Sequence, residues 1–154
     1  MIYHLTPSNF PGLFLGRIRR RVYLTAVFLF VVVLSGCEKL PYTNLDNDGL
    51  DAMLKDNVPI FDIRRVEEWK QTGIVAGSQL LTFVDKQGRL NQDFLQQFVA
   101  DVGPNDPVIL ICRTGNRTAT LARLLTEQLG YTQVYNVRDG ITRWKQDNRP
   151  VRRL

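Results

Sequence analysis

Histidine is nearly absent from this chain of 154 residues, because its single copy, His4, lies close to the amino terminus. A Cys-His dyad, a Ser-His-Asp triad and a His-ligated metal centre are therefore excluded for the part of the chain after residue 36. A nucleophile in that part must be activated without an imidazole base, which electrostatic stabilisation of a thiolate can achieve. We expect neither a metal ion nor another cofactor.

Acidic residues are missing from the first 36 positions, whereas four arginines occur there. These arginines account for most of the net charge of +5, so the remainder of the chain is close to neutral. The positive charge therefore does not indicate nucleic-acid binding, and we expect no nucleic-acid partner. The four residues are Arg17, Arg19, Arg20 and Arg21.

An uncharged run of thirteen residues, Val22–Leu34, follows the arginines. It is shorter than the roughly 20 residues that cross a bilayer and suits the apolar region of a signal peptide. The next residues, Leu34-Ser35-Gly36-Cys37, resemble the lipobox of bacterial lipoproteins, which implies that Cys37 carries lipid. We expect a signal peptide over 1–36, a tether over 37–44 and a protein anchored by lipid in the cell envelope, facing the periplasm or the exterior. The alternative is an uncleaved amino-terminal anchor with an unmodified Cys37.

Apolar strand patterns alternate with helical patterns over residues 45–154, which predicts one α/β domain. We expect an open parallel sheet of four or five strands with helices on both faces. The helical patterns predict buried faces that include Val66 with Trp69, and Phe98 with Val99. Predicted strands cover 58–63, 79–84, 108–111 and 133–137. Predicted helices cover 65–72, 91–102, 118–129 and 141–146, with a short helix near Leu50 that Asn47 or Asp48 caps.

The segment Cys112–Thr118 lies between a predicted buried strand and a predicted helix. A thiol at the end of such a strand faces the free N–H groups and positive dipole end of the helix, which favour the thiolate. Gly115 lets successive N–H groups turn inward as a nest, and Arg113 and Arg117 add positive charge. The pattern predicts an anion-binding loop with Cys112 as nucleophile. The alternative is that Cys112 is a small buried side chain ending a strand.

The pattern Cys-x-x-Gly-x-Arg-Thr in this loop resembles the active-site loop of the rhodanese (sulfurtransferase) family. The resemblance implies a rhodanese-like fold and a Cys112 that takes up a sulfane sulfur as a persulfide. The loop counts six residues from Cys112 to Arg117, one fewer than in related phosphatases, which favours sulfur over phosphorus as the attacked atom. The substrate-binding positions implied are Arg113, Thr114, Gly115, Asn116, Arg117 and Thr118.

Two further segments resemble other sequence blocks of the family. Asp62 ends a predicted parallel strand, so we expect it on the same sheet edge as Cys112. There it either accepts hydrogen bonds from the loop or braces an arginine, or it serves as an ordinary turn residue. Arg64 is a second supporting candidate, although nearby glutamates favour a surface ion pair for it. The segments are Asp62-x-Arg64 with Glu67, Trp69 and Gly73–Ser78, and Asp139-Gly140 with Trp144 and Pro150-Val151.

The implied mechanism begins when the Cys112 thiolate attacks the outer sulfur of thiosulfate or a related sulfane donor. Arg113 and Arg117 bind the sulfonate-like end, sulfite leaves and a persulfide remains on Cys112. The only other cysteine is Cys37, so Cys112 has no partner thiol within the chain if Cys37 carries lipid. The acceptor must then be external: cyanide, a small thiol or a protein thiol.

Two other functions are compatible with the loop. One is phosphatase or arsenate-reductase chemistry on the same anion-binding loop, against which the loop length argues. The other is a non-catalytic module that senses oxidants through a reactive thiol, or that keeps the fold for contacts with a partner.

Overall fold

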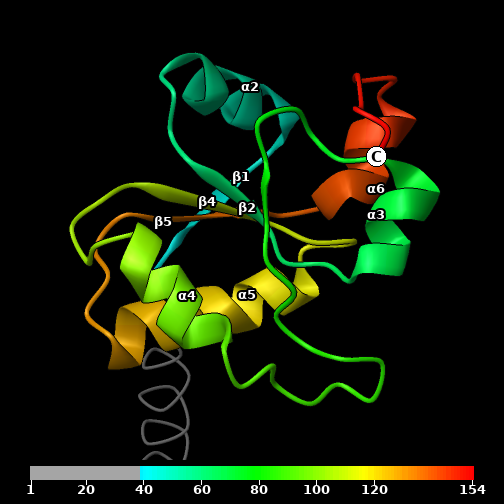
Figure 1. Cartoon of the computed structure of the whole chain (residues 1–154). Helices are drawn as coiled ribbons and strands as arrows, with labels where there is room; N and C mark the ends of the chain where they lie inside the picture. Colours follow the sequence, from blue (N-terminus) through cyan, green and yellow to red (C-terminus); the bar gives the residue numbers. More distant parts are fainter. Residues whose placement is uncertain (1–38) are drawn as a thin grey trace, which may run out of the picture. The chain divides into compact units, whose positions relative to one another are not determined.

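Four consecutive apolar residues, Val108–Ile111, are fully buried and form β4, the central strand of a five-stranded sheet. The structure is a computed structural model that describes residues 39–154 (Figure 1). The predicted signal peptide and Cys37 lie outside the described residues. The strands run parallel in the order β1-β5-β4-β2-β3. The other strands are β1 (Thr43–Leu45), β2 (Ile60–Asp62), β3 (Gln79–Leu80) and β5 (Val134–Val137).

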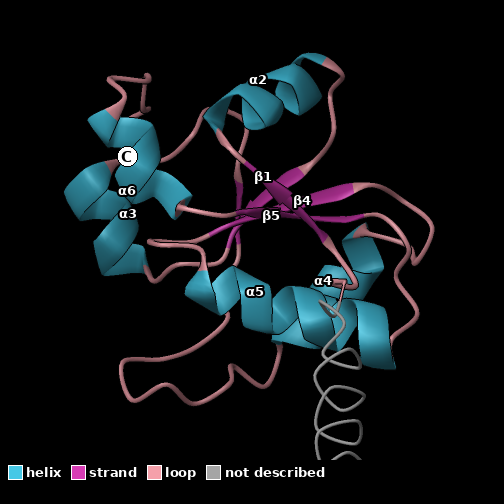
Figure 2. Cartoon of the chain, turned by 180° about the vertical axis from the view of Figure 1, so that it is seen from behind, coloured by secondary structure: helices cyan, strands magenta, loops and turns pink. Residues whose placement is uncertain are grey.

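Helices cover both faces of this sheet, as the alternation of strands and helices predicts (Figure 2). Val108, Leu110 and Cys112 point to one face, where they pack with α4, α5 and η1. Ile109 and Ile111 point to the other face, where they pack with α2 and α6. The helices are α2 (Asn47–Lys55), α3 (Val66–Thr72), α4 (Phe94–Asp101), α5 (Asn116–Arg123), the π-helical turn η1 (Leu124–Gln128) and α6 (Gly140–Gln146).

The start of the domain differs from the prediction. The tether was expected to reach residue 44, but Thr43 and Asn44 already belong to β1 and pair with β5. The cap of α2 is Asp46, whose carboxylate accepts a hydrogen bond from Gly49 N–H at 2.8 Å, rather than Asn47 or Asp48. The carboxyl end of β1 therefore passes directly into a capped helix on the sheet edge where the site is expected.

Several element boundaries and two buried positions were also predicted wrongly. The strand expected over 79–84 is only two residues long, although Leu81 N–H donates to the carbonyl of Asp62 at the end of β2 and Phe83 N–H to that of Ile63 just after it. Val66 and Val99 are about half exposed, at 47% and 50%, so they lie outside the core. The helix expected from Thr118 begins two residues earlier, at Asn116.

Within residues 39–154, none of the helices has the length and apolar composition needed to cross a bilayer.

Candidate active site

Cys112 directly follows β4 and shares a sheet face with Leu110, so its side chain turns toward α5. Cys112 is 1% exposed and belongs to the hydrophobic cluster on that face. The sulfur is nevertheless not sealed in apolar packing, because the N–H of Gly115 donates to Cys112 Sγ across 3.2 Å. Thr118 Oγ1 lies 3.5 Å from the same sulfur. The sequence predicts several successive loop N–H groups around the sulfur; within residues 39–154 one of them, that of Gly115, is hydrogen-bonded to it.

The Thr118 hydroxyl connects the sulfur to the first turn of α5. It donates to the carbonyl of Gly115 at 2.9 Å, so its lone pair is then free to accept a hydrogen bond from a protonated Cys112. If the hydroxyl rotates, the same oxygen can instead donate to a thiolate. The Thr118 hydroxyl and the Gly115 N–H can therefore both stay hydrogen-bonded to the sulfur whether Cys112 is a thiol or a thiolate.

Gly115 has a positive φ of 84°, which places its amide toward the sulfur and begins α5. A Cβ at this position would lie 1.8 Å from the carbonyl oxygen of Arg138. On the other side of the same contact, a Cβ on Gly140 would lie 2.5 Å from the carbonyl oxygen of Cys112. These two glycines let the loop after β4 pack directly against the turn between β5 and α6.

The two arginines of the loop have different surroundings. Arg113 is exposed, and within residues 39–154 its guanidinium forms no ion pair, although its carbonyl accepts hydrogen bonds from Thr142. Arg117 is half-buried and binds Glu68 through two parallel hydrogen bonds of 2.8 and 2.6 Å. The side-chain hydrogen bond to Glu68 raises the pKa of Arg117 despite its partial burial. Arg117 is therefore a fixed positive charge beside the loop, with the neighbouring cysteine also favouring its charged form.

Glu68 is the main residue of the site that the sequence analysis missed. Burial raises the pKa of Glu68, but hydrogen bonds from the Arg117 side chain and the Arg65 backbone, with the charges of both arginines, lower it to about 2. The carboxylate also closes the amino terminus of α3, where it accepts from Arg65 N–H at 3.1 Å. The sequence does hold one signal for the role of Glu68, which is its place at the third position of the helix. Glutamates at this position often accept a hydrogen bond from the residue that caps the helix.

Arg64 is fully buried and not part of a surface ion pair, which corrects the prediction for it. Its guanidinium binds both oxygens of Asp62, at 2.6 to 3.1 Å, and neither side chain is exposed. It also donates to Gly73 O at 2.8 Å and to Thr72 Oγ1 at 2.6 Å. Asp62 therefore braces an arginine, one of the roles expected for it, and the pair fixes the end of β2 to the end of α3.

The remaining loop positions face outward. Thr114 and Asn116 are exposed, and Asn116 is the first residue of α5. The loop thus presents solvent-accessible side chains at Arg113, Thr114 and Asn116, while Cys112 and Thr118 lie inside.

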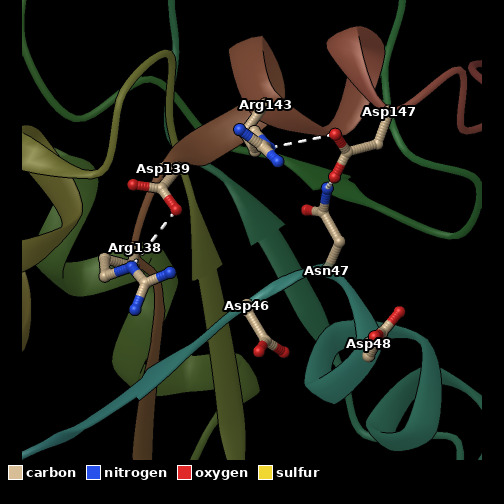
Figure 3. Close-up of a pocket in the computed structure, with 7 residues that line it drawn as sticks. All are labelled: Asp46, Asn47, Asp48, Arg138, Asp139, Arg143 and Asp147. Atoms are coloured by element: carbon tan, nitrogen blue, oxygen red, sulfur yellow. Dashed lines mark hydrogen bonds and ion pairs between the residues drawn. The ribbon is translucent and has the colours of Figure 1, made fainter.

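A polar cavity of about 340 Å³ lies farther along the same sheet edge, beyond β5 and β1 (Figure 3). Arg138 and Asp139 pair with each other in it at 3.2 Å. Asp147 accepts from Asn47 at 2.7 Å and pairs with Arg143 at 2.9 Å. Asp139 and Asp147 thus pair with lining residues, whereas Asp46 caps α2 and Asp48 pairs with Arg149, which does not line the cavity. Arg138 lines the cavity as an exposed charge at the end of β5.

Comparisons with known proteins agree with the fold. A model of the rhodanese-like domain family matches residues 46–147. The protein RP600 of Rickettsia prowazekii is 31% identical over 108 residues, which cover 64% of this chain and 85% of that protein. The thiosulfate sulfurtransferase GlpE of Actinobacillus pleuropneumoniae is 32% identical over 62 residues, covering 40% of this chain and 56% of the relative. The crystal structure of Rv0390 from M. tuberculosis superposes with a TM-score of 0.62 at 27% identity, covering 73% of this chain and 99% of that chain.

Proposed function

Because the chain belongs to the rhodanese-like domain family, we propose that it is a sulfurtransferase that carries a sulfane sulfur on Cys112. The donor is thiosulfate or another persulfide-type compound, and the acceptor is an external thiol or cyanide. The observation that carries the proposal is the Gly115 N–H pointing at Cys112 Sγ at the start of α5. This arrangement stabilises negative charge on the sulfur without a proton-accepting base. The similarity to a thiosulfate sulfurtransferase over part of the chain supports the same chemistry.

In the proposed first half-reaction, the Cys112 thiolate attacks the outer sulfur of thiosulfate. A bond forms between the two sulfurs, the S–S bond of thiosulfate breaks, and sulfite leaves with its electron pair. The exposed guanidinium of Arg113 favours the approach of the dianionic donor, whereas the charge of Arg117, expected to bind the donor as well, is paired with the Glu68 carboxylate. The Gly115 N–H, which donates to the sulfur of Cys112, then lies beside the persulfide.

The proposal is tested by following thiocyanate formation from thiosulfate and cyanide with the purified full-length chain. Cys112→Ser should lose the enzymatic rate entirely, because oxygen cannot form the persulfide. Cys37→Ser is the matched control, since it removes the other thiol and should retain the wild-type rate. A wild-type protein that turns over no sulfane donor, yet whose Cys112 is rapidly alkylated, would support the sensing alternative instead.

We further propose that lipid on Cys37 anchors the domain at the cell envelope, with the signal peptide of residues 1–36 removed. The support is the order of arginines, uncharged run and lipobox-like residues in the sequence. Labelling cells with a radioactive fatty acid tests this proposal, because the protein should incorporate label and Cys37→Ser should not. An unlabelled wild-type protein would contradict it.

A further inference from the structure

The first turn of α6 holds two carbonyl groups of the catalytic loop. The N–H of Ile141 donates to the carbonyl of Cys112 at 2.9 Å. The N–H of Thr142 donates to the carbonyl of Arg113 at 3.1 Å, and the Thr142 hydroxyl donates to the same oxygen at 2.8 Å. One residue outside the loop therefore occupies both lone pairs of the Arg113 carbonyl.

These hydrogen bonds also fix the direction of the N–H groups that follow in the loop. A trans peptide is planar, so its N–H points opposite to its carbonyl, and within residues 39–154 no peptide is cis. The Cys112 carbonyl thus sets the direction of the Arg113 N–H, and the Arg113 carbonyl sets that of the Thr114 N–H. Both carbonyls point toward α6, which packs on the sheet face of Ile109 and Ile111. Both N–H groups are therefore directed to the opposite side of the loop, where the Cys112 side chain turns toward α5.

The N–H groups of Arg113 and Thr114 are available to a ligand. Within the described part of the chain neither donates a hydrogen bond, whereas the next N–H in the loop, that of Gly115, donates to Cys112 Sγ. Successive N–H groups that point to one side of a loop attract an anion. The direction of the Thr114 N–H depends on the Arg113 carbonyl and therefore on Thr142.

We propose that Thr142 is a positioning residue for the reaction, because its hydroxyl holds the Arg113 carbonyl toward α6 and thereby aims the Thr114 N–H at the anionic end of the sulfur donor. The inference rests on the proposed sulfurtransferase function. The sulfonate-like end of thiosulfate is charged both before and during attack by Cys112, so a correctly aimed N–H strengthens binding in both states. Loss of the hydroxyl should act mainly on the thiosulfate concentration needed for loading, and little on the limiting rate.

Three variants of the full-length chain separate the hydroxyl from the rest of the side chain. Thr142→Val removes the hydroxyl at nearly constant volume, and Thr142→Ser restores it. Thr126→Val is the matched control, because the Thr126 hydroxyl also donates to a backbone carbonyl at 2.8 Å, that of Ala122. It lies in η1, away from the catalytic loop.

The first measurement follows a single round of sulfur loading by intact mass at increasing thiosulfate concentrations. Thr142→Val should raise the half-saturating concentration about threefold and leave the limiting rate nearly unchanged. The effect is modest because the Thr142 N–H still holds the Arg113 carbonyl. Thr142→Ser and Thr126→Val should both match the wild type.

The second measurement does not require sulfur transfer. Cys112 is alkylated with iodoacetate, which is anionic, or with iodoacetamide, which is neutral, and Cys37→Ser is present in every sample so that one thiol reacts. Thr142→Val should slow the reaction with iodoacetate about threefold and leave the reaction with iodoacetamide unchanged. Thr142→Ser and Thr126→Val should alter neither rate.

A merely structural role for Thr142 predicts a smaller fraction of folded protein, with an unchanged half-saturating concentration and an unchanged ratio of the two alkylation rates. That result, an equal effect of Thr126→Val, or a failure of Thr142→Ser to restore the wild-type values would overturn the inference and leave the proposed function intact. Failure of the wild type to load sulfur from any donor, with the alkylation ratio altered as expected in Thr142→Val, would instead overturn the proposed function.

Discussion

At the scale of single residues, Gly115 determines whether a loop amide can face the nucleophile. Its φ of 84° is strained for any residue with a side chain, and a Cβ would also collide with the Arg138 carbonyl. We predict that Gly115→Ala destabilises the protein by about 3 kcal/mol or more and abolishes sulfur loading, because the loop must move away from β5. Urea unfolding and persulfide formation measure the two effects.

Gly77→Ala is the control for this prediction, since Gly77 has a similar φ of 82° but no atom within 4 Å of the added Cβ. It should cost about 1 kcal/mol from backbone strain alone and leave sulfur loading unchanged. Equal losses of stability in the two variants would show that the close approach to Arg138 contributes nothing.

The buried pair of Asp62 and Arg64 gives a second prediction at this scale. Removing Arg64 leaves the Asp62 carboxylate buried without its partner, so Arg64→Ala should lower the free energy of unfolding by about 3 to 5 kcal/mol. Arg123→Ala breaks an exposed ion pair with Glu127 on the helix surface and should cost less than about 0.5 kcal/mol. Urea unfolding of both variants measures the difference, and similar small losses would contradict the structural role assigned to Arg64.

The burial of Arg64 could not be predicted from the sequence, whereas the position of Cys112 could. Cys112 follows a run of four apolar residues and precedes a glycine and a helix, so local pattern suffices to place it. The partners of Arg64 come from β2 and from the far end of α3, including Gly73 O. Adjacent glutamates made a surface pair the better expectation, but the turn after β2 directs the guanidinium inward instead.

At the scale of elements, the contact between Glu68 and Arg117 joins α3 to α5 across 49 residues of sequence. The pKa of Glu68 is about 2 in the folded protein, below its ordinary value of 4.5, so the folded state binds fewer protons between these values. The stabilisation is therefore complete above pH of about 4.5 and is lost as the pH falls toward 2.

We predict that the difference in Tm between wild type and Glu68→Gln is constant near neutral pH and shrinks as the pH falls through this window. Thermal unfolding monitored by circular dichroism between pH 7 and about 2 measures it. Glu127→Gln, which removes an exposed helix-surface pair, is the control and should change the Tm little at any pH. A difference for Glu68→Gln that does not depend on pH would contradict the assigned ion pair.

Elements with long-range partners were the hardest to predict. The central strand and the helices α4 and α5 follow from hydrophobic pattern and were predicted, although Val99 of α4 lies outside the core. β1 was missed because Thr43–Leu45 has little strand pattern and exists through its pairing with β5. The predicted strand over 79–84 failed for the opposite reason, since its pattern is apolar but only Gln79 and Leu80 find a partner strand.

At the scale of the whole molecule, the parallel sheet brings groups that are distant in the sequence to one edge. Asp62, Cys112 and Arg138 all follow or end strands there, which the expectation of a parallel α/β sheet anticipates. The sequence did not indicate which side chains and turns near this edge would contact one another. Glu68 meets Arg117, Asp62 meets Arg64, and the β5–α6 turn packs on the catalytic loop.

The central claim is that Cys112 accepts one sulfur atom, and intact-mass spectrometry tests it most directly. The full-length chain is first treated with cyanide to remove any sulfane sulfur. It is then exposed to thiosulfate, and its intact mass is measured. The account predicts a gain of one sulfur atom that is reversed by cyanide, retained in Cys37→Ser and absent in Cys112→Ala. An unchanged mass of the wild type with thiosulfate and with other sulfane donors, or an equal gain in Cys112→Ala, would contradict it.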